Sequence, residues 1–356
     1  LTHGFVVDGQ GKKMSKSLGN VESPQDIIKN NGAEIMRLWV SAEDYKDDIR
    51  ISKEIIDRLV EAYRKIRNTA RFLLGNLNDF DNRDYSEHLL EIDRWAMSRL
   101  QGLIKKVTGA YERFEFHQVY HSLHNFCIVD MSSFYLDILK DRLYTFRADS
   151  PERRAGQWVL RHILSVMTRL MAPVLSFTAE EIWGFMPKGA GVRGQEARDN
   201  GQGIRGQGQD IEPESVFLAE FPVVDERFID EAMESRWEKL IAVRNEVNKA
   251  LEIKRQDRFI GNALEAKVTI FAGEEYYRML NGYREFLPAL FIVSDAEIRN
   301  SPPEGDVVES PDLKGVSISV ERAPGDKCER CWNWSTEVNT LPDAPGLCRK
   351  CYNNLK

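Results

Sequence analysis

Hydrophobic residues recur at helical spacing through the middle of the chain, beginning after residue 52. The first run places apolar side chains at Ile55, Ile56, Leu59, Val60, Tyr63 and Ile66. Ser52 is a suitable N-cap, because its hydroxyl can accept a hydrogen bond from a free backbone N–H, and Gly75 is a suitable end. The pattern predicts an amphipathic helix between these two residues.

Four more helical patterns follow before residue 188. One begins at Asp93 as N-cap, and a second spans about 117–143. A third begins at Ser150-Pro151, a cap with proline at the first helical position, and a fourth begins at Thr178 with a capping box. Amphipathic helices joined by short connections predict a helical bundle over residues 51–187.

The pattern changes after residue 187. Residues 188–212 contain seven glycines among polar residues, a composition that buries too little apolar surface to offset its conformational entropy, so a flexible insertion is expected. Beyond it, helical patterns at 235–256 and 274–287 are interleaved with short strand-like runs at 266–270, 291–293 and 316–320. This order predicts a small α+β unit over residues 213–325.

The first fifty residues combine a short strand candidate, a glycine-rich turn and a basic string. The apolar run His3–Val7 is followed by Asp8-Gly9-Gln10-Gly11, and Lys13-Met14-Ser15-Lys16-Ser17 comes next. Lysine ammonium groups and small hydroxyls on a loop suit a polyanion, because they supply point charges and hydrogen-bond donors for phosphate. The alternative is an ordinary solvated basic turn.

Four of the five cysteines lie in two close pairs near the end of the chain, Cys328-x-x-Cys331 and Cys348-x-x-Cys351. Two such turns at this separation match a structural zinc site, in which four thiolates complete a tetrahedron and leave no open coordination position. The spacing predicts a zinc ribbon over residues 326–356, with two disulfides or four unrelated thiols as the alternative. Cys127 lies in an apolar stretch and is expected in the core.

Composition is that of a multidomain globular chain. With 356 residues, two to three domains are expected, and a hydrophobic content of 42% supports real cores. No apolar run is long enough to span a membrane. Because the net charge is −7, nucleic-acid binding would have to depend on local basic faces.

Three further groups each have a functional and a structural interpretation. Arg64, Arg67 and Arg71 share one helix face, which could contact phosphates or be a solvated face. His117, His121 and His124 also share a face, but no carboxylate completes a metal motif, so packing among aromatic residues is favoured. Trp332 and Trp334 could stack on bases or cover the small core of the ribbon.

The string Lys13–Ser17 resembles the KMSKS signature of class I aminoacyl-tRNA synthetases. The sequence from His3 to Val21 is similar to that of the isoleucine, valine, leucine and methionine subgroup. The segments that resemble bacterial-type isoleucyl-tRNA synthetases are Leu38–Ser41 through Asp48–Ser52, Tyr63–Thr69, Met171–Leu175 and the cysteine ribbon with Cys331-Trp332. The resemblance covers almost the whole chain and departs from the family around 188–212.

The resemblance implies a mainly α fold. A helical-bundle anticodon-binding domain at 51–187 would follow the end of a Rossmann-like catalytic domain at 1–50 and precede the α+β unit and a zinc ribbon held by four cysteines. A nucleotide-binding half with a HIGH motif and an editing domain would lie upstream, so the chain is expected to be a C-terminal portion that is inactive alone.

The resemblance also implies a mechanism. ATP, with Mg²⁺, and isoleucine would give isoleucyl-adenylate and pyrophosphate, and the amino acid would pass to tRNA(Ile). Lys16 would neutralise charge on the leaving pyrophosphate, with Lys13 second, while Met14, Ser15 and Ser17 would shape the ATP-binding loop. The family is cytoplasmic and not membrane-bound, and a monomer is expected. The alternatives are a non-catalytic tRNA-binding module and a valine or leucine synthetase relative.

Overall fold

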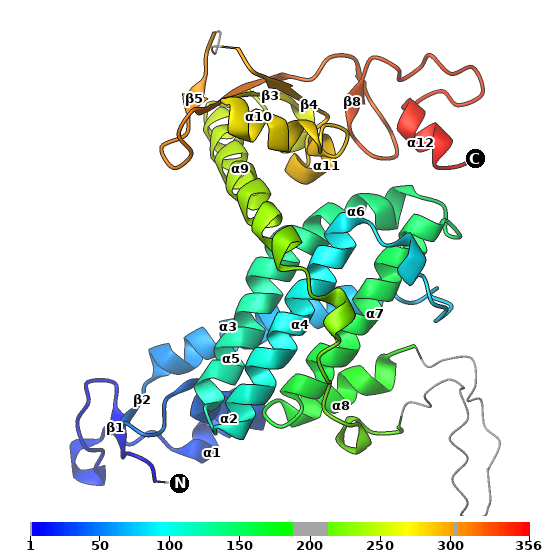
Figure 1. Cartoon of the computed structure of the whole chain (residues 1–356). Coiled ribbons are helices and arrows are strands. Elements are labelled where there is room, and N and C mark those ends of the chain that lie inside the picture. The colour runs from blue at the N-terminus through cyan, green and yellow to red at the C-terminus, as the bar shows by residue number, and fades with distance from the viewer. Residues whose placement is uncertain (1, 188–212, 302–304) are drawn as a thin grey trace, which may run out of the picture. The chain divides into compact units, whose positions relative to one another are not determined.

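The computed structural model describes residues 2–187, 213–301 and 305–356, so the expected insertion at 188–212 lies outside the described residues. The chain forms two compact units (Figure 1). The first comprises Leu1–Asp137 and Arg154–Ile229, and the second comprises Ile138–Arg153 and Asp230–Lys356. Among the described residues, no helix is both long and apolar enough to cross a membrane.

The N-terminal segment of the first unit holds a parallel pair of short strands, β1 (Val6–Asp8) and β2 (Ile49–Ile51). The connection between them contains a 3-10 turn, η1 (Lys16–Leu18), and two helices, α1 (Pro24–Asn31) and α2 (Ala33–Ala42). The indole Nε1 of Trp39 donates to the carbonyl of Arg50 at 3.0 Å, which ties α2 to β2. The prediction of a strand, a loop and short helices in this segment is confirmed.

Helix α3 (Lys53–Gly75) begins and ends where its sequence predicts. The Ser52 hydroxyl accepts from the backbone N–H of Ile55, so the cap prediction is also confirmed. Its apolar face is buried through Ile56, Leu59, Ala62, Ile66, Ala70 and Leu73.

Helix α4 (Glu91–Glu112) starts earlier than predicted. Asp93 is not the N-cap but the third helical residue, and its carboxylate reaches back to accept from the N–H of Leu90 at 3.0 Å. The same buried carboxylate accepts from the Tyr135 hydroxyl at 2.8 Å. An acidic residue at the third position satisfies a helix terminus as well as one at the cap, and the sequence alone does not separate the two arrangements.

The single helix predicted at 117–143 is three consecutive helical elements. These are α5 (Phe116–Asn125), the π-helix η3 (Phe126–Tyr135) and α6 (Leu136–Thr145). Helix α5 packs against α3 and α4, and Figure 1 shows these three helices side by side. A π-helix bonds i to i+5, so the apolar residues of η3 follow a different spacing from that of the flanking helices.

The last two helices of the bundle are α7 (Pro151–Met171) and α8 (Ser176–Phe185). The start of α7 is as predicted, since the Ser150 hydroxyl accepts from the N–H of Arg153 at 3.3 Å. The capping box expected at Thr178 is wrong. Helix α8 begins at Ser176, Thr178 is buried inside it, and the carboxylate of Glu34 caps the helix from α2.

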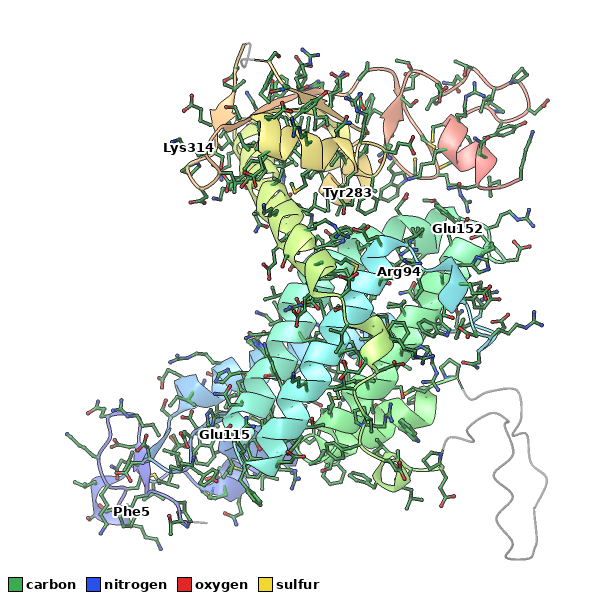
Figure 2. All side chains as sticks on the ribbon, viewed as in Figure 1. Phe5, Arg94, Glu115, Glu152, Tyr283 and Lys314 are labelled. Atoms are coloured by element: carbon green, nitrogen blue, oxygen red, sulfur yellow. The ribbon has the colours of Figure 1, made fainter. Side chains whose placement is uncertain are left out.

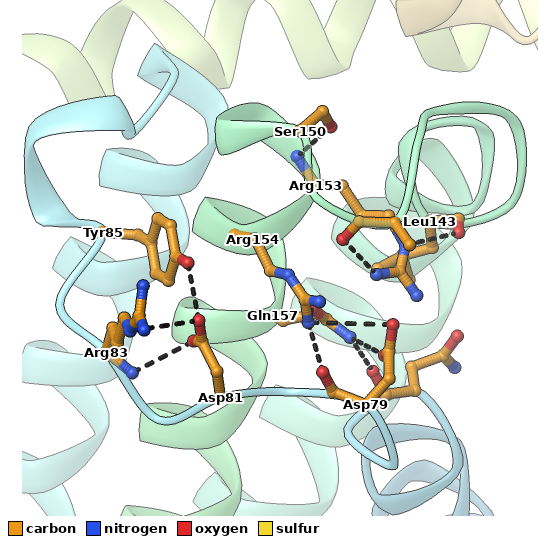
Figure 3. Close-up of polar contacts among 11 residues, drawn as sticks. Asp79, Asp81, Arg83, Tyr85, Leu143, Ser150, Arg153, Arg154 and Gln157 are labelled. Atoms are coloured by element: carbon orange, nitrogen blue, oxygen red, sulfur yellow. Dashed lines mark hydrogen bonds and ion pairs between the residues drawn. The ribbon is translucent and has the colours of Figure 1, made fainter. Parts of the chain in front are cut away.

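The α3–α4 connection is held against α7 by a polar cluster (Figure 3). The Gln157 amide donates to Asp79 Oδ1 at 2.6 Å and to the carbonyl of Asn76 at 2.8 Å. Arg154 donates to the carbonyl of Asp79, and the Tyr85 hydroxyl donates to Asp81 at 2.9 Å. Two of these bonds satisfy backbone carbonyl groups of the connection, those of Asn76 and Asp79.

The second unit is built on α9 (Glu231–Gln256) and a four-stranded sheet with the order β4-β3-β6-β5. The strands are β3 (Ala266–Ala272), β4 (Asp295–Arg299), β5 (Val308–Glu309) and β6 (Val316–Arg322). Strand β3 pairs in parallel with β4 and antiparallel with β6. Helix α9 packs against β6, and α10 (Glu274–Asn281) packs against β3 and β4.

Two details of this unit correct the sequence prediction. The helix expected at 274–287 ends at Asn281, and α11 (Leu287–Phe291) follows it as a separate element. The run Phe291–Val293 is not a strand, because Phe291 ends α11 and Ile292 is left-handed with φ 57°. The strands expected near 266–270 and 316–320 are confirmed.

The C-terminal segment has little regular structure. It contains the short antiparallel pair β7 (Asp326–Lys327) and β8 (Trp334–Ser335), followed by helix α12 (Arg349–Asn353). Its small core consists of the cysteine pairs with Val338 and Leu347. A core of this size needs support from a metal or from neighbouring elements.

Candidate functional site

The basic string lies on a loop whose base is organised by Asp8. Its Oδ1 accepts from the backbone N–H groups of Gln10 at 3.0 Å and Lys12 at 2.8 Å, and its Oδ2 accepts from Asn20 Nδ2 at 2.8 Å. These bonds, with that from Asn20 the strongest, lower the pKa of Asp8. Asp8 is the last residue of β1, so the carboxylate closes the loop on the strand that leads into it.

Asn20 closes the other end of the same loop. Its Oδ1 accepts from the N–H of Ser15 at 2.9 Å, and its Nδ2 also lies 3.3 Å from the carbonyl of Lys13. Ser15 in turn caps η1 by accepting from the N–H of Leu18, and its hydroxyl lies 3.1 Å from that of Ser17. We call Asp8 and Asn20 the clasp of the loop.

The loop lysines remain available to a ligand. Lys12, Lys13 and Lys16 are exposed, and within the described part of the chain none of their ammonium groups joins an ion pair. The carboxylate of the clasp is occupied by backbone N–H groups and an amide, so it does not neutralise these cations with a salt bridge. Three unpaired ammonium groups on a hydrogen-bonded loop are suited to a polyphosphate.

The four cysteines near the C-terminus come together. Their Sγ atoms all lie within 4.8 Å of one another, and three of the four residues are buried. The Cys331 and Cys348 sulfurs are 3.7 Å apart, close to the separation of about 3.8 Å that a tetrahedral zinc with Zn–S bonds of about 2.3 Å requires. All four cysteines are free, so the disulfide alternative is wrong.

Both knuckles are shaped by backbone hydrogen bonds. The N–H of Trp332 donates to the carbonyl of Cys328 at 2.9 Å, and Trp332 is left-handed with φ 65°. In the second pair the N–H of Cys348 points at Cys328 Sγ at 3.3 Å. The contact between Cys331 and Cys348 lowers the pKa of Cys348 and raises that of Cys331, as expected when neighbouring thiols share one negative charge. Four converging sulfur donors with N–H support fit a soft or borderline metal ion.

The arginine face is partly neutralised. Arg64 pairs with Glu61 at 2.5 Å on its own helix, and Arg67 pairs with Glu181 of α8 at 2.8 Å. The pKa of Arg67 is raised, chiefly by its hydrogen bond to the Tyr63 hydroxyl. Arg71 has no ion-pair partner among the described residues. Of the three, Arg71 is the one whose charge is free.

The histidines and tryptophans have different surroundings. Tyr120 stacks on His124 with ring centroids 5.6 Å apart, burial lowers the pKa values of His121 and His124, and the three imidazoles form no metal-ligand group in the described ranges. Trp332 is 60% exposed, with Lys327 Nζ 5.1 Å from its ring, so it does not cover the ribbon core. Trp334 is half-buried and donates its backbone N–H to Ser294.

Sequence reasoning missed Asp8, Asn20 and Glu34. The sequence identifies Asp8 only as part of a glycine-rich turn, although an aspartate two residues before a free N–H is a known turn signal. Nothing in the sequence pairs Glu34 with residues 177 and 178, because the contact joins positions 143 and 144 residues apart.

Two descriptions of known protein families match segments of this chain. The description "Anticodon-binding domain of tRNA ligase" matches residues 93–270, which is half of the chain, and "tRNA synthetases class I (I, L, M and V)" matches residues 1–52, the segment with the signature loop. The chain belongs to the tRNA ligase family. The second match shows that residues 1–52, which carry the loop, are similar to class I tRNA synthetases.

Relatives within the family are similar over the whole chain. The isoleucine–tRNA ligase of Syntrophotalea carbinolica is 51% identical over 356 residues, covering 99% of this chain and 36% of the relative. Those of Geobacter sulfurreducens and Caldanaerobacter subterraneus subsp. tengcongensis are each 47% identical over all of this chain and 36% of their own lengths. This tRNA ligase chain therefore spans about a third of the length of the relatives it matches.

Proposed function

We propose that this chain is the part of an isoleucine–tRNA ligase that supplies the ATP-contact loop and binds the tRNA. The observation that carries the proposal is similarity to isoleucine–tRNA ligases from one end of the chain to the other. The unpaired lysines on the clasped loop are consistent with it. The substrates of the complete enzyme would be isoleucine, ATP with Mg²⁺, and tRNA(Ile).

The loop would act on the first half-reaction. The isoleucine carboxylate attacks the α-phosphorus of ATP, the adenylate forms, and pyrophosphate leaves. Lys16 would contact the leaving pyrophosphate and Lys13 would assist, because an ammonium group aimed at developing charge stabilises the transition state more than the ground state. Met14, Ser15 and Ser17 would shape the loop, as the cap from Ser15 to Leu18 illustrates.

The remaining regions would hold the tRNA. We assign residues 1–50 to the end of the catalytic domain, 51–187 to the helical anticodon-binding domain, 188–212 to an insertion, 213–325 to the α+β unit and 326–356 to a zinc ribbon. Zinc is the proposed metal of the four-cysteine cluster, with Cys328, Cys331, Cys348 and Cys351 as ligands. It would be structural, since four thiolates complete its coordination. We propose a cytoplasmic monomer.

A charging assay tests the proposal. The complete ligase containing this chain should attach isoleucine to tRNA(Ile) and should not charge valine or leucine tRNAs with their amino acids. The chain by itself should bind tRNA(Ile) without charging it. Charging of valine or leucine tRNA instead would assign the chain to a different member of the class I group.

A second candidate function, a tRNA-binding module without catalysis, is favoured by the match of residues 93–270 to an anticodon-binding domain. The coding sequence upstream decides between the two. An open reading frame with a HIGH motif in the same gene establishes the ligase, and its absence establishes the module.

A further inference from the structure

Helix α2 connects the loop-bearing segment to the helical bundle. On one side, Trp39 bonds to β2, which pairs with β1, and β1 leads into the loop. On the other side, Glu34 and Arg37 reach the turn between α7 and α8. The two residues are three apart, so they project from the same face of the helix.

Glu34 caps the beginning of α8. Its side chain belongs to a residue that is only 9% exposed, and its Oε1 accepts from the N–H groups of Phe177 at 2.8 Å and Thr178 at 3.0 Å. Its Oε2 accepts from the Thr178 hydroxyl. A carboxylate at a helix N-terminus satisfies free N–H groups and interacts favourably with the helix dipole, here across a sequence separation of more than 140 residues.

Arg37 binds the chain that leaves α7. Its Nε donates to the carbonyl of Val174 at 2.9 Å, and its Nη2 donates to the carbonyl of Pro173 at 2.7 Å. Nη2 also lies 3.3 Å from the Ser176 hydroxyl. One helix thus places an anion on the donor end of α8 and a cation on the carbonyl groups just before it, and we call this pair the α2 clamp.

A second set of bonds fixes α8 to α3. The Tyr63 hydroxyl lies 2.8 Å from Thr178 Oγ1, next to the clamp, and Arg67 pairs with Glu181 one turn further along α8. Helix α8 is therefore bonded both to α2 and to the helix that carries the arginine face. The contacts run without interruption from β1, through α2 and α8, to α3.

We propose that Glu34 and Arg37 are positioning residues. They would hold the loop that carries Lys13–Ser17 at a fixed position relative to the helical bundle during transfer of isoleucine to the tRNA. The inference rests on the proposed function. Adenylate formation needs the loop and small substrates only, whereas transfer also requires a tRNA held by the bundle to present its end at the catalytic domain. A displacement of about 1 Å can cost about a hundredfold in rate, so loss of register acts on the second step.

A substitution at Arg37 can distinguish this positioning role from a role in fold stability. Its side chain is exposed and its partners are carbonyl groups that water can also satisfy, while the bundle has a large apolar core of its own. Replacing it should leave the bundle folded. Glu34 is buried, so Glu34→Gln, which keeps one acceptor oxygen, serves as the second variant.

The test uses the complete ligase and measures each step separately. For Arg37→Gln we expect pyrophosphate exchange without tRNA within about twofold of wild type, tRNA affinity within about twofold, and single-turnover transfer from preformed adenylate at least about tenfold slower. Arg37→Lys should recover part of the transfer rate, since one ammonium group can reach one of the two carbonyls. Glu34→Gln should show the same split to a smaller extent.

Arg83→Gln is the matched control, because Arg83 is an exposed arginine whose ion-pair partner among the described residues is Asp81, on the same α3–α4 connection. It should change neither step. An unchanged transfer rate in Arg37→Gln would overturn the inference, and so would an equal fall in exchange and transfer with a lowered melting temperature, which would assign the clamp to fold stability. A wild-type enzyme that shows no isoleucine-dependent exchange would instead overturn the proposed function.

Discussion

The clasp between Asp8 and Asn20 is a small feature with a specific chemical logic. A carboxylate only accepts hydrogen bonds, whereas an amide both donates and accepts them, so Asn20 donates to Asp8 and not the reverse. Each residue also accepts a hydrogen bond from a backbone N–H of the loop. Because the pKa of Asp8 is lowered, its stabilisation of the loop is complete above the ordinary aspartate range and is lost as the pH falls through the lowered value.

Exchanging the two residues tests this logic. Asn20→Asp sets two carboxylates against each other, and Asp8→Asn brings amide donors within reach of each other, so each should slow adenylate formation by about tenfold in the complete ligase. The double variant Asp8→Asn with Asn20→Asp restores a donor opposite an acceptor and should return to within about threefold of wild type. The measurement is pyrophosphate exchange as a function of ATP concentration. A double variant no better than the singles would contradict the clasp.

Lys16 is the residue proposed to meet the pyrophosphate. Lys16→Ala removes an ammonium group that acts mainly in the transition state, so it should lower the maximal rate of isoleucine-dependent pyrophosphate exchange at least about a hundredfold while isoleucine binding changes little. Lys29→Ala is the matched control, because Lys29 is an exposed lysine on α1, outside the loop, and its replacement should leave the rate unchanged. A Lys16→Ala rate within about twofold of wild type would remove Lys16 from the site.

Predictions for single residues succeeded unevenly. The clustering of the cysteines and the exposed basic loop were predictable because both follow from residue type and short spacing. Phe5, labelled in Figure 2, lies in the run His3–Val7 that precedes this loop and is 80% exposed. Glu34 was not predictable, because an isolated glutamate on a helix is ordinary and its partners lie far along the chain. A contact between residues so far apart in the chain cannot be predicted from the local sequence.

At the scale of single elements, we predict that the ribbon depends on a zinc ion bound by its four cysteines. Zinc bound by four thiolates contributes about 10 kcal/mol or more to the folding of a small module. Elemental analysis of the purified chain should give close to one zinc, and Cys348→Ser should lose it. Cys127→Ala is the matched control, since Cys127 is a fully buried cysteine outside the cluster and should keep the metal. A metal-free ribbon that stays folded would contradict the assignment.

Helix α3 offers a graded test of tRNA contact. Arg71 is unpaired among the described residues, whereas Arg64 and Arg67 share their charge with Glu61 and Glu181. Arg71→Gln should therefore reduce the dependence of log affinity on log salt by about one unit, and the other two substitutions should reduce it less. Glutamine is a good helix former, so circular dichroism should be unchanged. Equal slopes in all variants would make this a solvated face.

Elements with strong periodicity were predicted well and short apolar runs were not. Helix α3 has both a cap and a long amphipathic pattern, which fixes its ends. The run Phe291–Val293 has only three residues, and its apolar character suits a buried helix end as well as a strand. The π-helix was also missed. It packs against α3 and α4, and its residues show no pattern that distinguishes them from those of an α-helix.

At the scale of the whole molecule, the chain is a member of the tRNA ligase family. It forms two compact units, and half of its residues match an anticodon-binding domain. The sequence predicted this class through the signature loop and the cysteine pairs. It could not assign which surfaces meet which bases, since such contacts depend on side chains brought together only by the fold.

The most direct test of this account is the affinity of the chain for tRNA(Ile) compared with the same tRNA carrying a substituted anticodon, measured over a range of salt concentrations. Phosphate contacts weaken with salt for both RNAs, whereas base contacts distinguish them. If the chain reads the anticodon, tRNA(Ile) should bind about tenfold or more tightly than the substituted tRNA at every salt concentration. Equal affinities throughout would show that the chain does not read the anticodon and would contradict the account.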